Sequence, residues 1–288
     1  NGNNDIPVIT SDITSARGNV TEAGTNVSGT ASTTGTLTSN DVDNAATKNW
    51  SLNKLSGTYG DIIINSSTGV WTYTLDNTKV KTQNLAAGEQ GKEVFIATVT
   101  DDNNTTASQE IRITVKGSND APIISVEEVD TATLILNETN STLNSNGTLS
   151  ITDFDTSNTV SVEKVNVVTS GTTTGLISTN DELFAMLSIN SENVIDNSNT
   201  TGTINWAFNS GSEYFNYLAS GETLTLTYTI KASDDDSSNA FDTQTVVITI
   251  TGTNDIPLIN SSIISTLNNT TSTGSISFSD VDTTNTPT

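Results

Sequence analysis

Apolar residues in this chain occur in short runs that alternate with polar residues, and stretches of Gly, Asn, Thr and Ser separate the runs. A period of two is typical of strands with one buried face. The pattern predicts strands at residues 93–100, 110–115, 224–230 and 245–250. Residues 60–65 and 70–75 predict a hairpin with Gly69 in its turn.

Helical periodicity is nearly absent, and only residues 183–187 suggest a single helical turn. Short strands at regular spacing predict an all-β fold of the β-sandwich type. The apolar fraction of 33% is low for a globular chain and raises the possibility of disorder. The grouping of the apolar residues into alternating runs argues against disorder.

One six-residue phrase occurs three times and holds three of the four prolines. We call Gly2–Pro7 the opening linker, Gly117–Pro122 the first linker and Gly252–Pro257 the second linker. Their aspartates, Asp5, Asp120 and Asp255, are 115 and 135 residues apart, which are lengths of single compact domains.

Two further signals keep register with the linkers. Gly35, Gly147 and Gly274 each precede an Asp-x-Asp motif by six residues, and the motifs are Asp41/Asp43, Asp153/Asp155 and Asp280/Asp282. Leu85–Glu89 (LAAGE) and Leu218–Glu222 (LASGE) each begin 16 residues before an acidic cluster, at Asp101 and Asp234. The sequence therefore predicts one repeat at 1–117, a second at 118–252 with an insertion at about 156–205, and the start of a third at 253–288.

The chain has a net charge of −23, which disfavours nucleic acid and anionic membrane surfaces as partners. No stretch has the character of a membrane span, so direct membrane insertion is not expected. Cysteine and histidine are both absent. Disulfides, thiolate metal sites, the usual zinc ligands and a Ser-His-Asp triad are thereby excluded. With no initiator Met or signal peptide, we expect an internal piece of a longer secreted protein.

The repeated acidic positions are oxygen donors of the kind that calcium prefers, since this ion takes six to eight oxygens from carboxylates, amide carbonyls and water. Clustered carboxylates repel one another unless a cation lies between them, by roughly 4 kcal/mol for a pair 4 Å apart at an effective dielectric of about 20. The proline in each linker fixes its own φ and extends the preceding residue, which makes the linker stiff. A calcium-dependent linker is therefore the leading hypothesis.

Other interpretations apply to single motifs. An Asp-x-Asp or Asn-Asp in a loop is often turn chemistry, because both side chains bind their own backbone. Paired carboxylates can hydrolyse glycosides, but an active site occurs once and needs a pocket, whereas these pairs recur, so we expect no enzyme. Trp50, Trp71 and Trp206 could form a sugar-binding platform, although core packing is favoured for Trp71 and Trp206.

Residues 57–77, GTYGDIIINSSTGVWTYTLDN, together with LAAGE, VTDD and GSNDAP, closely resemble the VCBS repeats of large bacterial surface proteins. These repeats belong with the cadherin-like and Ig-like extender domains of RTX adhesins exported by type I secretion. The resemblance covers the first repeat, is looser in the second and reaches only the opening of the third. It implies tandem Ig/cadherin-like β-sandwich domains joined end to end by short Pro-containing linkers, with calcium at the joints.

The resemblance also implies a set of calcium ligands for each linker. At the first linker these are Glu22, Glu89, Asn119, Asp120, Asp153, Asp155 and Asp234. At the second linker they are Glu138, Glu222, Asn254, Asp255, Asp280 and Asp282. At the opening linker they are Asn4, Asp5, Asp41, Asp43 and Asp101. The third repeat has no Glu at the position that Glu22 and Glu138 hold in the others.

The leading expectation is an extracellular stalk on a bacterial cell, stiffened by calcium, that holds a distal adhesive domain for surface or biofilm attachment. Its partners would be calcium and the neighbouring repeats of the same chain. One alternative is a carbohydrate-binding module in the longer second repeat, with a cell-surface glycan as ligand. Another is a subunit of an extracellular filament or surface layer, in which another copy of the protein completes the third repeat by strand addition.

Overall fold

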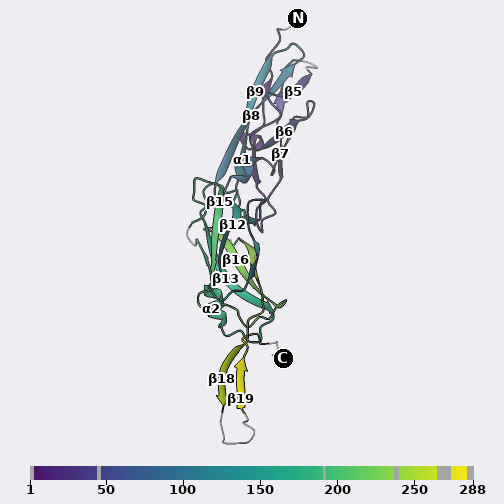
Figure 1. The fold of residues 1–288 in the computed structure, drawn as a ribbon. Coiled ribbons are helices and arrows are strands. Elements are labelled where there is room, and N and C mark those ends of the chain that lie inside the picture. Colours follow the sequence, from purple (N-terminus) through teal and green to yellow (C-terminus); the bar gives the residue numbers. More distant parts are fainter. Residues whose placement is uncertain (1–2, 44–46, 191–192, 237–239, 265–273, 284–288) are drawn as a thin grey trace, which may run out of the picture.

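A computed structural model describes residues 3–43, 47–190, 193–236, 240–264 and 274–283 of the chain. Two β-sandwiches and a hairpin follow one another along one long axis (Figure 1). The described chain is almost entirely strand and loop, which confirms the predicted all-β fold. Gly2 of the opening linker lies outside the described residues.

The first sandwich contains two sheets and a short strand pair. The sheet of order β2-β9-β8-β5 faces the sheet of order β3-β7-β6, and β1 pairs with β4. The elements are β1 (Val8–Ile9), η1 (Ile13–Ala16), β2 (Arg17–Thr21), β3 (Ser32–Thr36), β4 (Ser39–Asn40), β5 (Lys48–Leu52), β6 (Gly60–Ile64), β7 (Val70–Leu75), α1 (Val80–Gln83), β8 (Gln90–Asp101) and β9 (Thr106–Lys116).

The second sandwich repeats this plan with more regular sheets. The sheet of order β11-β17-β16-β13 faces the sheet of order β10-β12-β15-β14. The elements are β10 (Ile123–Ser125), β11 (Thr133–Asn137), β12 (Asn144–Thr152), β13 (Val160–Gly171), α2 (Asn180–Ala185), β14 (Leu187–Ile189), β15 (Thr201–Asn209), β16 (Thr223–Asp234) and β17 (Phe241–Thr251). The segment that sequence assigned to an insertion contains β13, α2 and β14.

Each sandwich encloses its own apolar core. One core gathers buried residues between Ala16 and Val115, and the other gathers buried residues between Ile124 and Ile250. The alternation seen in the sequence explains this, because in β8 and β16 every second side chain is buried. The repeat boundaries at 117/118 and 252/253 stay a prediction.

The same strand pairings hold both sandwiches together. A long antiparallel pair closes each one, β8 with β9 and β16 with β17. A short strand from the beginning of the repeat then pairs in parallel with the last strand, β2 with β9 and β11 with β17. Strands β8, β9, β16 and β17 are longer than the sequence predicted, because Thr, Ser and Gln continue the alternation beyond the apolar runs.

In both sandwiches, the glycine that precedes the Asp-x-Asp motif by six residues packs under a tryptophan. Gly35 pairs with Trp71 and Gly147 pairs with Trp206 across neighbouring strands. A Cβ at Gly147 would lie 2.4 Å from Cζ2 of Trp206, and one at Gly35 would lie 2.6 Å from Cζ2 of Trp71. The glycine therefore leaves room for the indole ring at the same place in both cores.

The hairpin at 60–75 is confirmed, with Gly69 at a φ of 69° between β6 and β7. The predicted helical turn at 183–187 was placed too late. The helix α2 begins earlier because Thr179 accepts from the N–H of Glu182 while the Glu182 carboxylate accepts from the N–H of Thr179, a capping box. Leu187 belongs to strand β14.

Beyond the second linker, β18 (Leu258–Ile264) and β19 (Gly274–Ser279) form a two-stranded antiparallel sheet. Its pairing of Ile259 with Phe278 matches the pairing of Ile124 with Ile151 in the second sandwich. Ile124 and Ile151 are buried, whereas Ile259 and Phe278 are 72% and 53% exposed. The hairpin therefore has the register of the first strands of a sandwich, with its apolar face uncovered in the described structure.

Candidate metal site

The first and second linkers each leave the last strand of a sandwich through a glycine that lies against main-chain carbonyls. A Cβ at Gly117 would be 2.1 Å from the Leu85 oxygen, and one at Gly252 would be 2.3 Å from the Leu218 oxygen. The carbonyls belong to the LAAGE and LASGE segments, so two motifs that are distant in the sequence meet here.

The aspartate of each linker binds the second aspartate of the next Asp-x-Asp motif. The Asp120 N–H donates to Oδ2 of Asp155 at 2.8 Å. The same bond joins Asp5 to Asp43 at 2.8 Å and Asp255 to Asp282 at 3.1 Å. Three linkers thus share one contact that brings the predicted ligands of each motif together.

Within each Asp-x-Asp motif, the first aspartate caps the second. Asp155 N–H donates to Oδ1 of Asp153 at 3.0 Å, and the equivalent bonds in the other motifs measure 3.0 and 3.1 Å. This is the turn chemistry expected of such residues. It uses one oxygen of the first aspartate.

The linker asparagines extend the contacts to a later acidic cluster. Asn119 Nδ2 donates to the Asp120 carbonyl at 3.1 Å and to Oδ2 of Asp234 at 2.9 Å. Asn4 Nδ2 donates at matching distances of 3.0 Å to the Asp5 carbonyl and 2.9 Å to Oδ2 of Asp101. At the second linker, Asn254 donates to the Asp255 carbonyl at 2.7 Å.

Glu22 and Glu138 hold equivalent positions immediately after β2 and β11. Glu22 is fully buried, and its carboxylate accepts from Ser118 N–H at 3.4 Å and from Gln83 Nε2 at 3.0 Å. Oε1 of the buried Glu138 accepts from the N–H of Thr253 at 2.9 Å. Each glutamate therefore contacts the residue that precedes the linker Asn-Asp pair.

Glu89 and Glu222 contact their linkers through the main chain. The Glu89 carbonyl accepts from Gly117 N–H at 3.0 Å, and the Glu222 carbonyl accepts from Gly252 N–H at 2.9 Å. The Glu89 side chain is exposed. Oε2 of Glu222 accepts from Ala219 N–H within its own loop.

Burial raises the pKa of the carboxylates at the first linker, and repulsion between several of them adds to the effect. Burial raises the pKa of Glu22 to about 8, and the charges of Asp120 and Asp155 add to this. Burial raises the pKa of Asp155 to about 7 and that of Asp153 to about 6, again with contributions from neighbouring carboxylates. The pKa values of Asp120 and Asp234 are also raised by burial. This site is costly to keep negative without a cation.

Buried carboxylate oxygens without hydrogen-bond partners lie at each linker. They are Oδ2 of Asp120, Oδ2 of Asp153 and Oδ1 of Asp155 at the first linker, Oδ2 of Asp41 at the opening linker and Oδ2 of Asp255 at the second. Buried polar atoms nearly always have partners, so these oxygens suit a hard cation. Within the described ranges, however, no three acidic side chains already converge on one point as a bound metal requires.

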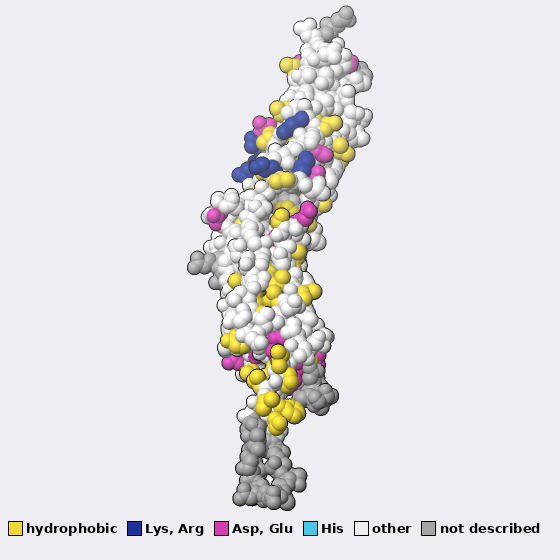
Figure 2. All heavy atoms as spheres, in the orientation of Figure 1, with side chains coloured by type: hydrophobic (Ala, Val, Ile, Leu, Met, Phe, Trp, Pro, Cys, Tyr) yellow, Lys and Arg dark blue, Asp and Glu magenta, His cyan; other side chains and the backbone are white. Residues whose placement is uncertain are grey.

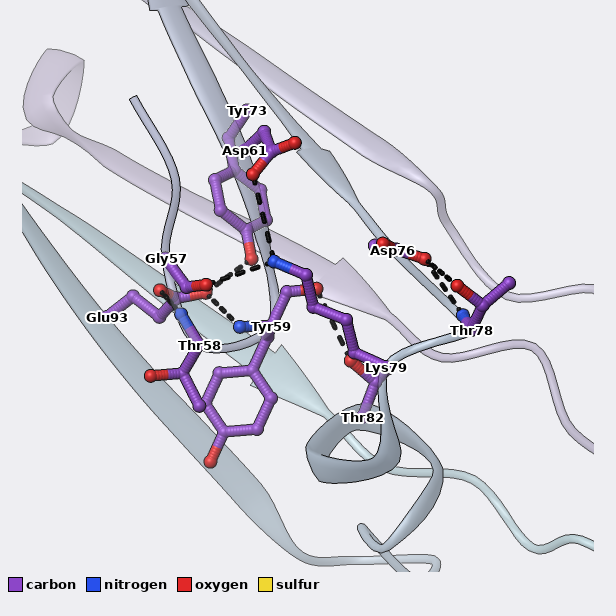
Figure 3. A network of polar contacts seen from close by, with 10 residues as sticks. All are labelled: Gly57, Thr58, Tyr59, Asp61, Tyr73, Asp76, Thr78, Lys79, Thr82 and Glu93. Atoms are coloured by element: carbon purple, nitrogen blue, oxygen red, sulfur yellow. Dashed lines mark hydrogen bonds and ion pairs between the residues drawn. The ribbon is translucent and has the colours of Figure 1, made fainter. Parts of the chain in front are cut away.

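Glu93 shows the contrasting case of a buried carboxylate inside a sandwich (Figure 3). Its Oε1 accepts from Tyr59 N–H at 2.8 Å and from the Tyr73 hydroxyl at 2.7 Å. Its Oε2 accepts from Thr58 N–H at 2.7 Å. Both oxygens have protein donors, so Glu93 joins the 57–59 loop to β7 and β8 without need of a metal.

Several polar residues that contact the linkers were not identified from the sequence. Nδ2 of the buried Asn158 donates to Oδ1 of Asn119 at 2.8 Å, and the hydroxyl of Thr25 accepts from Ala121 N–H at 2.7 Å. Asn140 Nδ2 donates to Oδ1 of Asp255 at 3.3 Å. In a chain so rich in Asn and Thr, composition does not distinguish these residues from their neighbours.

Another such contact recurs at two linkers. The hydroxyl of Thr156, directly after Asp155, donates to the carbonyl of Asn84 at 3.3 Å. The hydroxyl of Thr283, directly after Asp282, donates to the carbonyl of Tyr217 at 3.1 Å. Asn84 and Tyr217 each immediately precede the Leu of LAAGE or LASGE. A threonine thus connects each incoming repeat to the preceding one.

The tryptophans are all buried. Trp50, Trp71 and Trp206 are core residues, and the indole N–H groups of Trp71 and Trp206 donate to main-chain carbonyls at 2.9 and 2.8 Å. None of them offers an exposed ring for stacking on a sugar. The core interpretation of Trp71 and Trp206 is thereby confirmed, and it extends to Trp50.

Comparison with solved structures finds tandem cadherin domains. Cadherin domains 1–5 of protocadherin gamma B2 match with 13% identity and a TM-score of 0.43, over 88% of this chain and 41% of that one. Human protocadherin-24 EC1-2 matches with 17% identity and a TM-score of 0.42, over 88% and 100%. Mouse cadherin-23 EC22-24 matches with 14% identity and a TM-score of 0.44, over 90% and 71%. This chain spans about two fifths of the first of these.

No protein-family model and no curated protein sequence matches the chain. Identities and TM-scores at the level of these structural matches assign no family. Among the described residues, the helices are too short and too polar to cross a membrane.

Proposed function

We propose that this chain is a non-catalytic extracellular spacer, the extender region of a bacterial surface adhesin, whose β-sandwiches are held in line by calcium at the linkers. The supporting observation is the repetition of one contact set at three linkers, with unpartnered buried carboxylate oxygens in each. The assignment to an adhesin of the RTX type rests on the sequence resemblance to VCBS repeats. The repeats are proposed to meet at residues 117/118 and 252/253.

At the first linker, calcium would be held by Asp120, Asp153, Asp155, Asp234 and Glu22, with the side-chain oxygen of Asn119 as a further ligand. The ion would supply positive charge that offsets the repulsion among these groups. The first linker joins residues of both sandwiches, so their relative orientation would depend on the occupied site. Extracellular calcium modules bind with dissociation constants on the order of 10⁻⁴–10⁻³ M, which suits this location.

Small-angle scattering with calcium and with a chelator tests the proposal. We expect the maximum dimension to be sharply defined in calcium and the chain to become more flexible after chelation. Asp120→Asn should reproduce the flexible state in calcium, while circular dichroism shows that both sandwiches stay folded. Asp196→Asn is the matched control, because Asp196 lies in an exposed turn where its Oδ1 accepts from Ser198.

Scattering curves that do not respond to chelation would rule out a calcium-dependent linker. Loss of folded structure in Asp120→Asn would instead assign that residue to the stability of a sandwich. Isothermal titration of the full chain with calcium supplies an independent measure. Asp120→Asn should lose part of the heat of calcium binding, whereas Asp196→Asn should release the same heat as the wild type.

A second candidate function, a subunit of an extracellular filament, is favoured by the uncovered face of the β18–β19 hairpin. Ile259, Ile276 and Phe278 are 53–72% exposed, and their counterparts Ile124, Leu149 and Ile151 are buried under a second sheet. Another copy could supply such a sheet. The forward scattering in the same experiment gives the molecular mass. A monomer at all concentrations would exclude this candidate.

A further inference from the structure

The positive charges of the chain are confined largely to the first repeat. Of ten Lys and Arg residues, eight lie in residues 1–117 and two in the rest of the chain. The eight are Arg17, Lys48, Lys54, Lys79, Lys81, Lys92, Arg112 and Lys116. The net charge of −23 therefore conceals a strong difference between the repeats.

Four of these cations share the outer face of one sheet, and we call Arg17, Lys92, Arg112 and Lys116 the basic face. They lie on the neighbouring strands β2, β9 and β8, and all four are exposed. Arg17 is directly opposite Arg112 in the parallel pair, and Lys92 is opposite Thr114. Figure 2 shows the Lys and Arg side chains gathered on one part of the first sandwich.

The basic face contains a hollow of about 220 Å³ lined in part by Arg17, Lys92 and Arg112. Within the face, one carboxylate opposes the cations, since Glu110 forms an ion pair with Arg112. Glu93 lies beside the hollow, but its carboxylate is buried and bound to Tyr73, Tyr59 and Thr58 in the interior. The exposed side of the sheet thus carries an excess of positive charge.

The remaining outward positions are neutral. Asn19, Thr21, Gln90 and Thr114 lie beside the cations and supply hydrogen-bonding groups, and the apolar Val94 lies opposite Arg112 at the hollow. The outward positions of β2, β8 and β9 include no aromatic side chain on which a nucleic-acid base could stack. The face suits a flexible chain that carries carboxylates and hydroxyls.

We infer that the basic face binds an acidic polysaccharide, with Arg17 and Arg112 pairing with sugar carboxylates. Arginine matches carboxylate geometry through paired N–H donors, and lysine adds a mobile charge. This activity is independent of calcium at the linkers, because all four cations belong to one sheet. It assigns a carbohydrate ligand to the first repeat, whereas sequence directed attention to the second.

A second copy of the chain is a poorer match to this face. Much of the acidic charge lies at the linkers, where Glu22, Glu138, Asp153 and Asp155 are buried. On the outer side of β13, Glu163 already pairs with Lys231 at 3.3 Å. Repulsion by the whole chain is limited in range, because the Debye length is about 8 Å at physiological ionic strength. A bound polyanion therefore responds mainly to the local excess of cations.

Binding of the full chain to carboxymethyl-dextran, with unmodified dextran as the uncharged control, tests this inference. We expect binding to the carboxylated polymer alone, equal in calcium and chelator. The variant Arg17→Gln/Arg112→Gln should lose about tenfold or more in affinity, and the loss should shrink at high salt. Lys81→Gln/Lys231→Gln changes the net charge equally outside the basic face and should bind like the wild type.

Equal binding to both dextrans, or equal loss in the two double variants, would overturn the inference. Equally tight binding of single-stranded DNA would show a generic polyanion surface and overturn the polysaccharide assignment. Self-association that disappears in Arg17→Gln/Arg112→Gln, measured by sedimentation without polymer, would assign the face to a second copy. Calcium dependence of dextran binding would tie the activity to the linkers and contradict the placement on one sheet.

Discussion

Buried carboxylates occupy two different environments in this chain. Glu93 accepts three hydrogen bonds from protein groups, so its burial is compensated within the sandwich. Asp120, Asp153 and Asp155 each keep a buried oxygen without a partner, and their neighbours are other carboxylates. The donors that surround a buried carboxylate thus decide whether it is a structural group or a candidate metal ligand.

Tyr73→Phe tests the compensated case. It removes one donor to Glu93, and hydrogen bonds to a carboxylate contribute about 1.5–3 kcal/mol. We expect the free energy of unfolding of the first sandwich to fall by that amount in urea titrations followed by tryptophan fluorescence. Tyr228→Phe is the control, because the Tyr228 hydroxyl donates to the neutral carbonyl of Leu183 at 2.9 Å. Its cost should be about 0.5–1.5 kcal/mol. Equal costs would contradict the special role of Glu93.

At the scale of elements, the spaced motifs of the sequence correspond to contacts between strands. In both sandwiches the glycine before Asp-x-Asp lies beneath a tryptophan of the neighbouring strand, and the linker glycine lies against the LAAGE or LASGE carbonyls. Such signals are visible in sequence because each requires a particular residue at a fixed place. The sequence placed the helical turn at 183–187, too late in the chain, because the apolar residues of α2 continue into β14. The structure begins the helix after the cap at Thr179.

Gly147→Ala should destabilise the second sandwich by about 1–3 kcal/mol, the usual range for overpacking a core. The added methyl would meet the Trp206 ring at 2.4 Å, and Trp206 is buried in the core of that sandwich. Thermal unfolding followed by near-ultraviolet circular dichroism measures the change. Asn144→Ala, at an exposed position of the same strand β12, should stay within about 0.5 kcal/mol of the wild type. A neutral Gly147→Ala would show that the ring is not confined.

Across the whole molecule, the sequence predicted repeated sandwiches and acidic linkers. It did not predict surfaces that form only when distant strands become neighbours in a sheet. Asp-x-Asp and Asn-Asp-x-Pro are local signals, so the linker aspartates and the Asp-x-Asp motifs that they contact could be named in advance, whereas Asn158, Thr25 and Asn140 could not. The basic face forms because β2 pairs in parallel with β9, which places Arg17 beside Arg112 across 95 residues of sequence. Thr156 and Thr283 were equally hidden, because threonine is common throughout the chain.

The threonine contact predicts how the first linker behaves without metal. The bond from Thr156 to the Asn84 carbonyl connects the two sandwiches directly, and such a bond contributes about 0.5–1.5 kcal/mol. Thr156→Val should therefore widen the distribution of orientations in chelator and have no effect in calcium, where metal contacts would dominate.

Single-molecule energy transfer can measure that distribution, because the chain has no cysteine and two dyes can be placed at Ser67→Cys and Ser212→Cys alone. Both positions are exposed, and they lie in different sandwiches. Thr156→Ser keeps the hydroxyl and should match the wild type in both conditions. Thr283→Val alters only the second linker and should leave the measured distance unchanged. A Thr156→Val distribution as narrow as the wild type in chelator would show that the linker backbone and proline alone set the orientation of the sandwiches.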